Sequence, residues 1–333
     1  MRAIVVSDLH LTDRPADEYR WTVFSQIAEL SKKHAADELW ILGDLTEFKD
    51  YHSSRLVNRI ANRLHWCRKS SRLNFIHILR GNHDGLDPNT PYFRFLGFIG
   101  WCTFYSEPRI LESGRDRIAV LPHSRTLAED WNKLDVEDAT HIFLHATFDG
   151  ARAETGTRLR GDDPHMFDRT GAVVLSGDIH VPQKVGSVLY CGAPYPIRFG
   201  DRFRPRALVV VDRQVTSERL LNIRKLIVEF GPDVRQDPPA LRPGDQIKAI
   251  IKLRDSELGD WQEWKQLVQQ YCKEQSAVLS AVQLSKVGHT GKPKIQTKEH
   301  RTLTPAEALR AYCARNKVEA PLVKLGAQLL EED

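Results

Sequence analysis

The sequence predicts a layered α/β sandwich that carries a small α+β unit and ends in helices. Apolar runs alternate with amphipathic helical patterns over about the first 90 residues, an order typical of a mainly parallel sheet with right-handed crossovers. Later apolar runs follow one another without clear helices between them, which indicates a second sheet packed on the first. Most of these runs end in Asp, Asn or His, at the edge of an open α/β sheet where ligands bind.

The individual elements follow from local patterns. Each expected strand is a short apolar or β-branched run, and each helix carries apolar residues at helical spacing. Strands are expected at residues 3–6, 39–42, 74–79, 118–121, 142–144, 173–175, 185–191 and 207–211. The last two are assigned to the second sheet. Helices are expected at about residues 18–34 and after Ser53 or Ser54, either of which can cap a helix. The aromatic stretch at 92–105 has no assigned element.

Three segments are expected along the chain: residues 1–213 as the main domain, 214–285 as an accessory domain, and 286–333 as a basic linker with C-terminal helices. In the accessory domain, polar and apolar residues alternate along 246–253, as in a half-exposed strand. A second strand is expected at residues 278–284. Between them, Trp261 and Trp264 lie on one face of a helix. Thr304 suits the N-cap of the first C-terminal helix.

Composition narrows the class of protein. The chain has 333 residues, of which 41% are hydrophobic and 28% charged, as in ordinary globular proteins. No stretch approaches the ~18 apolar residues of a membrane span, and the N-terminus enters a strand without room for a signal peptide, so a cytoplasmic protein without membrane contact is expected. The 5 cysteines are scattered, which favours reduced thiols. The net charge of +4 permits an anionic partner without requiring one.

Side chains with metal-binding or acid–base chemistry gather at the carboxyl ends of the predicted strands. The candidates are Asp8, His10, Asp44, Asn82, His83, Asp84, His145, Asp178 and His180. Two divalent cations about 3.5–4 Å apart can bind both the attacking and the leaving oxygen of a phosphoryl group. Asp8 and His10 would face the same way if the strand pleat continued, and Asp44 is the natural bridging carboxylate. Mixed nitrogen and oxygen ligands suit manganese, iron or zinc better than calcium.

At these positions the sequence resembles the calcineurin-like metallophosphoesterases. The matching segments, in chain order, are Asp8-Leu9-His10, Gly43-Asp44, Gly81-Asn82-His83-Asp84, His145 and Gly177-Asp178-Ile179-His180. Within this superfamily the sequence is more similar to SbcD-type DNA nucleases, including phage exonuclease subunits. The narrower resemblance rests on residues 179–183 and 190–194, and on residues 243–245 with the strand and Trp261 helix that follow, which look like the capping domain of those nucleases.

The resemblance implies an α/β/β/α metallophosphoesterase sandwich and a two-metal DNA exonuclease or endonuclease of DNA processing or repair. It implies seven metal ligands, namely Asp8, His10, Asp44, Asn82, His145, Asp178 and His180. It also implies His83 as the acid that protonates the leaving oxygen, held by Asp84, with a metal-bound hydroxide as nucleophile. Manganese is the expected metal, with iron, zinc or magnesium as alternatives. The candidate partners are DNA, an SbcC-type coiled-coil ATPase and a second copy of the chain.

The sequence departs from the family pattern at two positions. Most relatives carry Gly-His-x-His, whereas this chain has Asp178 in place of the first His. A carboxylate can replace an imidazole as a ligand, so the departure concerns metal preference. SbcD-type nucleases place a His shortly after Gly-Asp, where this chain has Glu47, and His52 is a candidate substitute. The Gly-Asp-x-x-Asp-Arg-Gly signature of phosphoprotein phosphatases is missing at residues 43–49, which disfavours that activity.

Other interpretations stay open. The chain can be a phosphodiesterase or phosphatase for nucleotides or other small phosphates, or an inactive scaffold that binds proteins. His123 is interpreted as a structural loop residue, and Trp261 and Trp264 as helix core rather than a platform for bases. The basic run at 286–301 is interpreted as a solvated linker, with DNA contact as the alternative. Four arginines lie close together in the sequence and either bind a nucleic-acid backbone or form a solvated, salt-bridged surface: Arg198, Arg202, Arg204 and Arg206.

Overall fold

The structure is a computed structural model of the chain, and it describes residues 1–87, 89–124, 130–131, 134–232 and 238–286. It divides into two units, of which the first comprises Met1–Lys252 and Gly259–Ser285, and the second Leu253–Leu258 and the C-terminal residues from Lys286. The candidate site belongs to the first unit. The expected C-terminal helices and the basic run after Lys286 lie outside the described residues. The domain boundaries at 213 and 285 stay a prediction.

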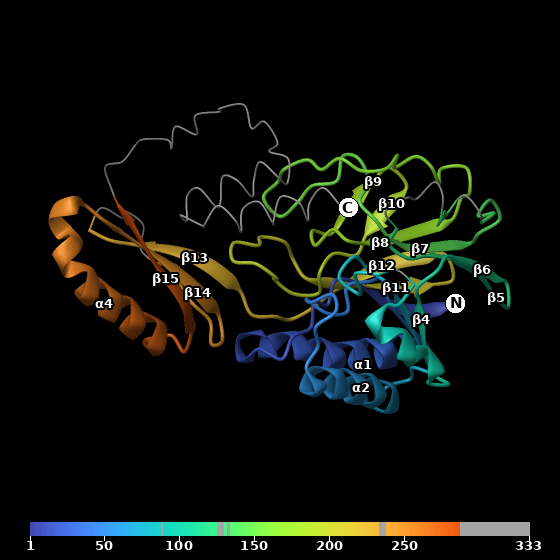
Figure 1. Cartoon of the computed structure of the whole chain (residues 1–333), viewed down its shortest axis with the longest axis horizontal. Helices are drawn as coiled ribbons and strands as arrows, with labels where there is room; N and C mark the ends of the chain where they lie inside the picture. Colours follow the sequence, from blue (N-terminus) through green and yellow to red (C-terminus); the bar gives the residue numbers. More distant parts are fainter. Residues whose placement is uncertain (88, 125–129, 132–133, 233–237, 287–333) are drawn as a thin grey trace, which may run out of the picture. The chain divides into compact units, whose positions relative to one another are not determined.

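The first sheet has six strands in the order β12-β11-β1-β2-β3-β4. Figure 1 labels β4, β11 and β12 of this sheet. The bounds of the six strands are β1 Arg2–Val6, β2 Glu38–Ile41, β3 Phe75–Leu79, β4 Cys102–Tyr105, β11 Arg206–Val211 and β12 Gln214–Arg219. Strands β1 to β3 run parallel, as predicted, and β4, a strand that was not predicted, runs parallel to β3. The assignment of residues 207–211 to the second sheet is wrong, because β11 pairs antiparallel with β1 and satisfies backbone groups that a free edge would leave unpaired. Strand β12 extends this sheet past residue 213.

The second sheet has the order β5-β6-β7-β8-β10-β9. Its strands are β5 Arg109–Ser113, β6 Asp116–Leu121, β7 His141–His145, β8 Val173–Gly177, β9 Gln183–Val185 and β10 Val188–Tyr190. Strands β6, β7, β8 and β10 run parallel, and β5 and β9 are antiparallel edges. The single strand expected at 185–191 is therefore wrong. A turn at Gly186, whose φ is +56°, separates β9 from β10.

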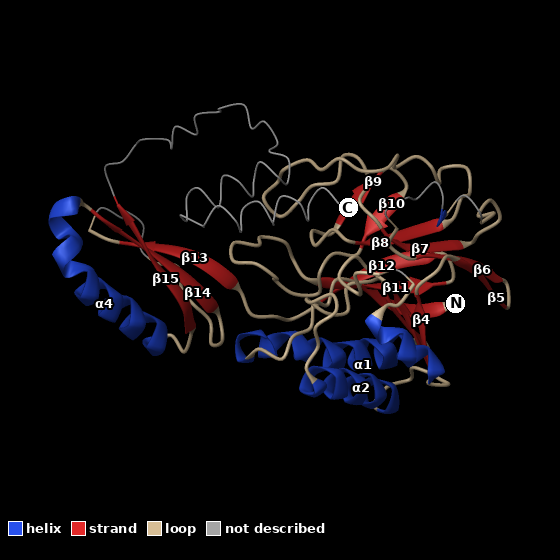
Figure 2. Ribbon diagram, in the orientation of Figure 1, coloured by secondary structure: helices blue, strands red, loops and turns tan. Residues whose placement is uncertain are grey.

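Two helices, α1 Val23–His34 and α2 Ser54–Lys69, lie side by side against the first sheet (Figure 2). Ser53 caps α2 as predicted, because its Oγ accepts a hydrogen bond from the Leu56 amide at 3.0 Å. The expected helix at 18–34 starts later than predicted, since Pro15–Thr22 forms a 3-10 helix. Tertiary contacts fix this turn: the Trp21 indole donates to the Thr12 carbonyl at 3.1 Å. A second 3-10 helix, Tyr92–Phe98, falls in the aromatic stretch.

Two-residue alternation along the strands builds the layers. In β1, Ala3 and Val5 face the core between the two sheets, while Ile4 and Val6 face the core under α1 and α2. In β7, Phe143 enters the inter-sheet core, and its neighbours pack on the outer face of the second sheet. Among the described residues, loop side chains such as Phe167 cover that outer face. The layered α/β sandwich predicted from the sequence is confirmed.

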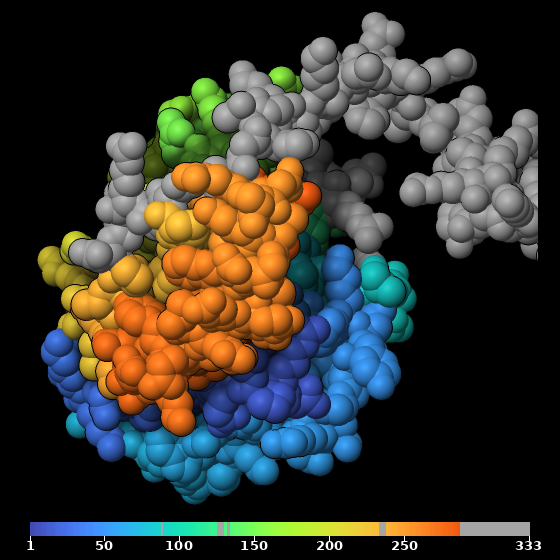
Figure 3. Space-filling view, turned by 90° about the vertical axis from the view of Figure 1, so that its left-hand side faces the viewer, coloured from blue at the N-terminus to red at the C-terminus, as the bar shows by residue number. Residues whose placement is uncertain are grey.

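A third sheet, of order β13-β14-β15, forms the accessory part together with one helix. Its elements are β13 Lys225–Phe230, β14 Gln246–Leu253, the 3-10 helix Asp255–Asp260, α4 Trp261–Glu274 and β15 Val278–Lys286. Strand β13 was not predicted. Helix α4 buries Val268 and Cys272, and Trp261 and Trp264 are half-buried, whereas Leu267 is 53% exposed. The outer surface of α4 faces the viewer in Figure 3.

Two features that the sequence analysis considered, membrane-spanning segments and cysteine pairing, can be compared with the described residues. No described helix combines the length and the apolar character needed to cross a bilayer. The four cysteines in the described ranges are free and buried, in agreement with the expectation of reduced thiols.

Candidate metal centre

The seven expected metal ligands come together at the carboxyl ends of the strands. Asp8 and His10 follow β1, Asp44 follows β2, Asn82 follows β3, and the others end or follow β7 and β8. Five of them line a pocket of about 230 Å³, here named the site pocket: His10, Asp44, Asn82, Asp178 and His180. Asp8 and His145 are fully buried. Side chains that are up to 172 positions apart in the sequence thus converge on one place.

Several of these residues have a left-handed backbone that non-glycine residues rarely adopt. The φ angle is +56° at Asp8, +42° at His10, +53° at Asp44 and +81° at Asp178. Such strained conformations cost free energy and cluster at functional sites. The pleat explanation for Asp8 and His10 is therefore wrong. Strand β1 ends at Val6, and left-handed turns direct both side chains into the site.

Asp44 occupies the centre of the cluster. Its Oδ2 lies 3.5 Å from His10 Nε2, and its Oδ1 lies 3.6 Å from His145 Nε2. In the described part of the chain, three groups of side chains place ligand atoms within 4.8 Å of one another: Asp8, His10 and His180; His10, Asp44 and His83; Asp8, Asp44 and His145. Because its two oxygens face different imidazoles, Asp44 has the orientation that a bridging carboxylate needs.

Two oxygen donors stand beside His145. The Asn82 side-chain oxygen lies 3.3 Å from His145 Nε2, and Asp178 Oδ1 lies 3.7 Å from the same nitrogen. The Thr147 hydroxyl donates a hydrogen bond to Asp178 Oδ2, so one carboxylate oxygen is held and the other faces the imidazole. The His145 ring is itself fixed, since its Nδ1 lies 2.7 Å from the Leu42 carbonyl. The Asp178 oxygen and the His145 imidazole are therefore close enough to bind the same cation.

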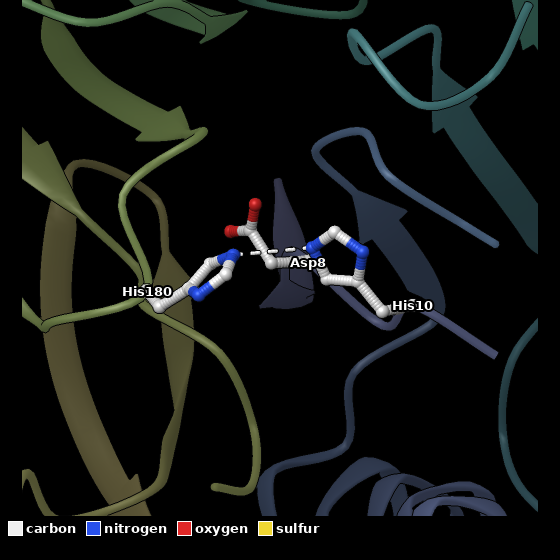
Figure 4. A group of neighbouring side chains, drawn as sticks. All are labelled: Asp8, His10 and His180. Carbon is white, nitrogen blue, oxygen red and sulfur yellow. Dashed lines mark hydrogen bonds between the residues drawn. The ribbon is translucent and has the colours of Figure 1, made fainter. Parts of the chain in front are cut away.

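Asp8, His10 and His180 form the other side of the cluster (Figure 4). Nε2 of His10 lies 3.1 Å from Nε2 of His180. Asp8 Oδ2 is buried and has no hydrogen-bond partner among the described residues. A buried, unpaired carboxylate oxygen is costly, and a cation bound by oxygen and nitrogen donors removes that cost. The residues present therefore fit a divalent metal.

Burial and mutual repulsion perturb the protonation of the cluster. Burial raises the pKa of Asp8, and burial with the nearby Asp84 charge raises that of Asp44 well above its ordinary value. Burial by itself lowers the pKa of His145, but the carboxylates of Asp44, Asp178 and Asp8 outweigh it and raise this pKa to about 9. In the protein without cations, Asp8, Asp44 and His145 therefore hold protons more strongly than usual, because these protons reduce the repulsion between the clustered carboxylates.

His83 and Asp84 have different surroundings from those expected. Asp84 is fully buried and accepts hydrogen bonds from the amides of Asp44, Leu45 and Gly81 at 2.8, 2.9 and 2.8 Å. The His83 ring is held instead by the Glu47 carbonyl, 2.7 Å from Nδ1. Within the described ranges Asp84 makes no hydrogen bond to this ring, so it braces the turns that carry Asp44 and His83.

Two glycines allow the close approach of these turns. Gly43 has a φ of +88°, and a Cβ on it would overlap the ring of His145. A Cβ on Gly81 would overlap Asp44 and His145, so Gly81 serves close packing rather than a left-handed turn.

Sequence reasoning missed Glu154 and the role of Glu47. Glu154 lines the site pocket, and its Oε1 lies 2.5 Å from His180 Nδ1, a contact that lowers the pKa of Glu154 to about 2. Glu47 Oε2 lies 3.5 Å from His10 Nδ1 and 3.3 Å from the guanidinium of buried Arg20. Glu154 lies in a loop without periodicity, so no local signal indicates it.

Neither His52 nor His123 lines the site pocket. His52 packs against Tyr92 and Phe93, with Nε2 at 2.8 Å from the Thr46 hydroxyl, so the proposed substitution for the missing histidine is not supported. The ring centroid of His123 lies 6.0 Å from that of His145, and burial lowers its pKa to about 4. Its carbonyl accepts a hydrogen bond from Arg80, which agrees with a structural loop residue.

A ring of carboxylates, imidazoles and one amide on a two-sheet sandwich is the donor set of a metal-dependent phosphoesterase. The model of the calcineurin-like phosphoesterases matches residues 1–182, and the chain belongs to that family. No curated protein was found to match. A solved archaeal phosphodiesterase is 12% identical with a TM-score of 0.37, over 66% of this chain and 100% of that one. Nuclease MPE of Pseudomonas putida is 14% identical with a TM-score of 0.32, over 65% of this chain and 87% of its own.

Proposed function

We propose that the protein is a two-metal phosphodiesterase that hydrolyses DNA, as an exonuclease, an endonuclease or both. One observation carries the proposal: the expected ligands, distant in sequence, meet around Asp44, with His83 in the same pocket. Asp8, His10 and His180 would hold one cation, Asn82, His145 and Asp178 the other, and Asp44 would bridge them. When bound, such cations neutralise phosphoryl charge and make a water molecule nucleophilic at neutral pH.

The residues of the chain supply the other parts of the reaction. The Glu47 carbonyl accepts the Nδ1 proton of His83, so in the imidazolium form the ring can donate its Nε2 proton to the leaving oxygen and return to neutral imidazole. The His83 amide donates to Asp44 Oδ1 at 2.8 Å, so acid and bridging carboxylate keep a fixed relation. Asp84 holds the backbone of both turns. Manganese is the proposed metal, and an SbcC-type ATPase stays a proposed partner.

The test is manganese-dependent digestion of labelled single- and double-stranded DNA with mapping of the product ends. Cutting by the wild type, and its loss in Asp44→Asn and His83→Gln, is the expected result. Hydrolysis of bis-p-nitrophenyl phosphate without any cutting of DNA would instead indicate an enzyme for small phosphodiesters. A protein that binds no metal and cuts neither substrate would indicate a scaffold.

A further inference from the structure

A second pocket, of about 390 Å³, begins next to the site pocket and is rich in arginine. Ile197 and Arg198 line the site pocket, and the preceding residue, Pro196, lines the second one. The charged residues of the second pocket, here named the arginine pocket, are Asp201, Arg202, Arg204, Arg219, Arg224 and Arg242. One short segment of chain, residues 196–205, therefore connects the two pockets and carries arginines into both.

Most of these arginines have no carboxylate partner. Arg224 is neutralised, because its guanidinium lies 2.5 Å from buried Asp245. Asp201 accepts hydrogen bonds from two backbone amides, those of Ile197 and Arg198, at 2.9 Å each. The other four arginines are exposed and form no ion pair within the described ranges: Arg202, Arg204, Arg219 and Arg242. The arginines of the lining outnumber its one carboxylate, Asp201, and this excess of positive charge favours an anionic ligand.

Apolar side chains lie among these arginines. Leu221 lines the pocket and is 74% exposed. Phe203 and Leu226 add half-buried apolar surface to the same lining. Guanidinium groups beside apolar and aromatic surface suit a nucleic-acid strand, whose phosphates bind cations while its bases pack on aromatic or apolar side chains.

We propose that the arginine pocket binds the single DNA strand next to the phosphodiester that is cut, with the strand passing from the site pocket over Arg198. This inference rests on the proposed function, and it resolves the two interpretations of the arginine stretch in favour of backbone binding for Arg198, Arg202 and Arg204. Arg206 does not line the arginine pocket and belongs to β11. A dinucleotide would fill the site pocket alone, whereas a longer strand would reach both pockets.

The test compares the full-length double variant Arg204→Gln/Arg242→Gln with the wild type. The control is Arg115→Gln/Arg213→Gln, whose exposed arginines line a different pocket near Met1. Binding of fluorescent single-stranded DNA of about 12 nucleotides, within the range of known single-strand sites, is measured by anisotropy in EDTA at several salt concentrations. Manganese-dependent hydrolysis of the same DNA, of a dinucleotide and of bis-p-nitrophenyl phosphate is measured alongside.

Each lost phosphate contact lowers the slope of log affinity against log salt by about 0.7, so the double variant should lose about 1.4 of this slope and bind about tenfold or more weakly at low salt. Hydrolysis of the dinucleotide and the small diester should stay at the wild-type level. Affinity and slope equal to those of the wild type would overturn the inference while leaving DNA cutting intact. A wild type that binds DNA through this pocket but does not cut it would overturn the proposed function alone, and a wild type that does not bind DNA would overturn both.

Discussion

Glu154 Oε1 lies 2.5 Å from Nδ1 of His180, while Nε2 of the same ring faces His10 in the site pocket. Carboxylates in this position fix the orientation and tautomer of a metal-binding histidine and raise its basicity. Burial alone lowers the pKa of His180, yet the contact with Glu154 and the charge of Asp8 raise it. Glu154 is therefore a positioning residue for the proposed metal centre, and it comes from a loop between the motifs of His145 and His180.

Replacing Glu154 by Gln should weaken manganese binding by about 10- to 100-fold, because the neutral amide no longer fixes the imidazole as a charged partner does. Titration calorimetry with manganese measures this directly in the metal-free protein. Glu154→Asp should recover part of the affinity, and Glu107→Gln, at an exposed site, should retain all of it. Wild-type affinity in Glu154→Gln would show that the contact has no role in metal binding.

His83→Gln should lower kcat on DNA by about 10²- to 10⁴-fold, the usual contribution of a general acid. The loss should be much smaller on bis-p-nitrophenyl phosphate, because nitrophenolate departs without protonation. Steady-state rates on both substrates with manganese test the role. An equal loss on the two substrates would argue that His83 acts on the metal centre or on folding, not as the acid.

Asp84→Ala should destabilise the fold, because it leaves three buried amide groups without an acceptor. The expected loss is about 3 kcal/mol or more in the free energy of unfolding. Urea denaturation of the metal-free protein measures it, with the exposed Asp138→Ala as control. A free energy of unfolding close to that of the wild type would mean that the turns of Asp44 and His83 do not depend on this carboxylate.

Stability of the metal-free protein should fall as the pH rises from about 6.5 to 9. The pKa of His145 is raised from 6.5 to about 9, so over this range the folded state holds a proton that the unfolded state has lost. The resulting stabilisation is complete below the unfolded pKa and disappears as the pH passes the folded one. Thermal melting after treatment with EDTA should show the fall, and manganese should reduce it by replacing the proton. A flat or rising Tm over this range would contradict the prediction.

Asp178→His should restore the usual family motif and shift metal preference from manganese towards zinc, since imidazole suits zinc better than a carboxylate does. The ratio of the two affinities, measured by competition, tests this. Thr147→Val removes the hydroxyl that holds Asp178 and should weaken manganese binding without changing the preference. An unchanged ratio in Asp178→His would place Asp178 outside the coordination sphere.

Local sequence patterns predicted the parts of the fold that depend on local physics. Apolar runs predicted strands β1 to β3, and a side-chain cap predicted the start of α2 at Ser53. The position of each expected ligand at or after the end of a strand follows from polar residues at strand ends. The sheet to which β11 belongs was wrongly predicted, because a run of Val and Leu fits either buried sheet. The two sheets are distinguished only by the pairing of β11 with β1, whose other edge pairs with β2.

The sequence predicted side chains that the structure brings together, but it did not predict the contacts that support them. Asp8, Asp44 and Asp178 have positive φ angles that the sequence did not predict, because Asp adopts them more readily than most residues but far less often than Gly. Glu154 comes from a loop whose position depends on tertiary packing. Asp84 was expected to hold His83, but the Glu47 carbonyl does so, a backbone contact that side-chain identity cannot indicate.

The central claim is that Asp44 and its neighbours hold two cations in one pocket. The most direct test is the stoichiometry of manganese bound after equilibrium dialysis, measured by elemental analysis for the wild type and for Asp44→Asn. The account predicts two manganese ions per wild-type chain and a clear loss in the variant. One ion or none per wild-type chain, or a stoichiometry unchanged by Asp44→Asn, would contradict it.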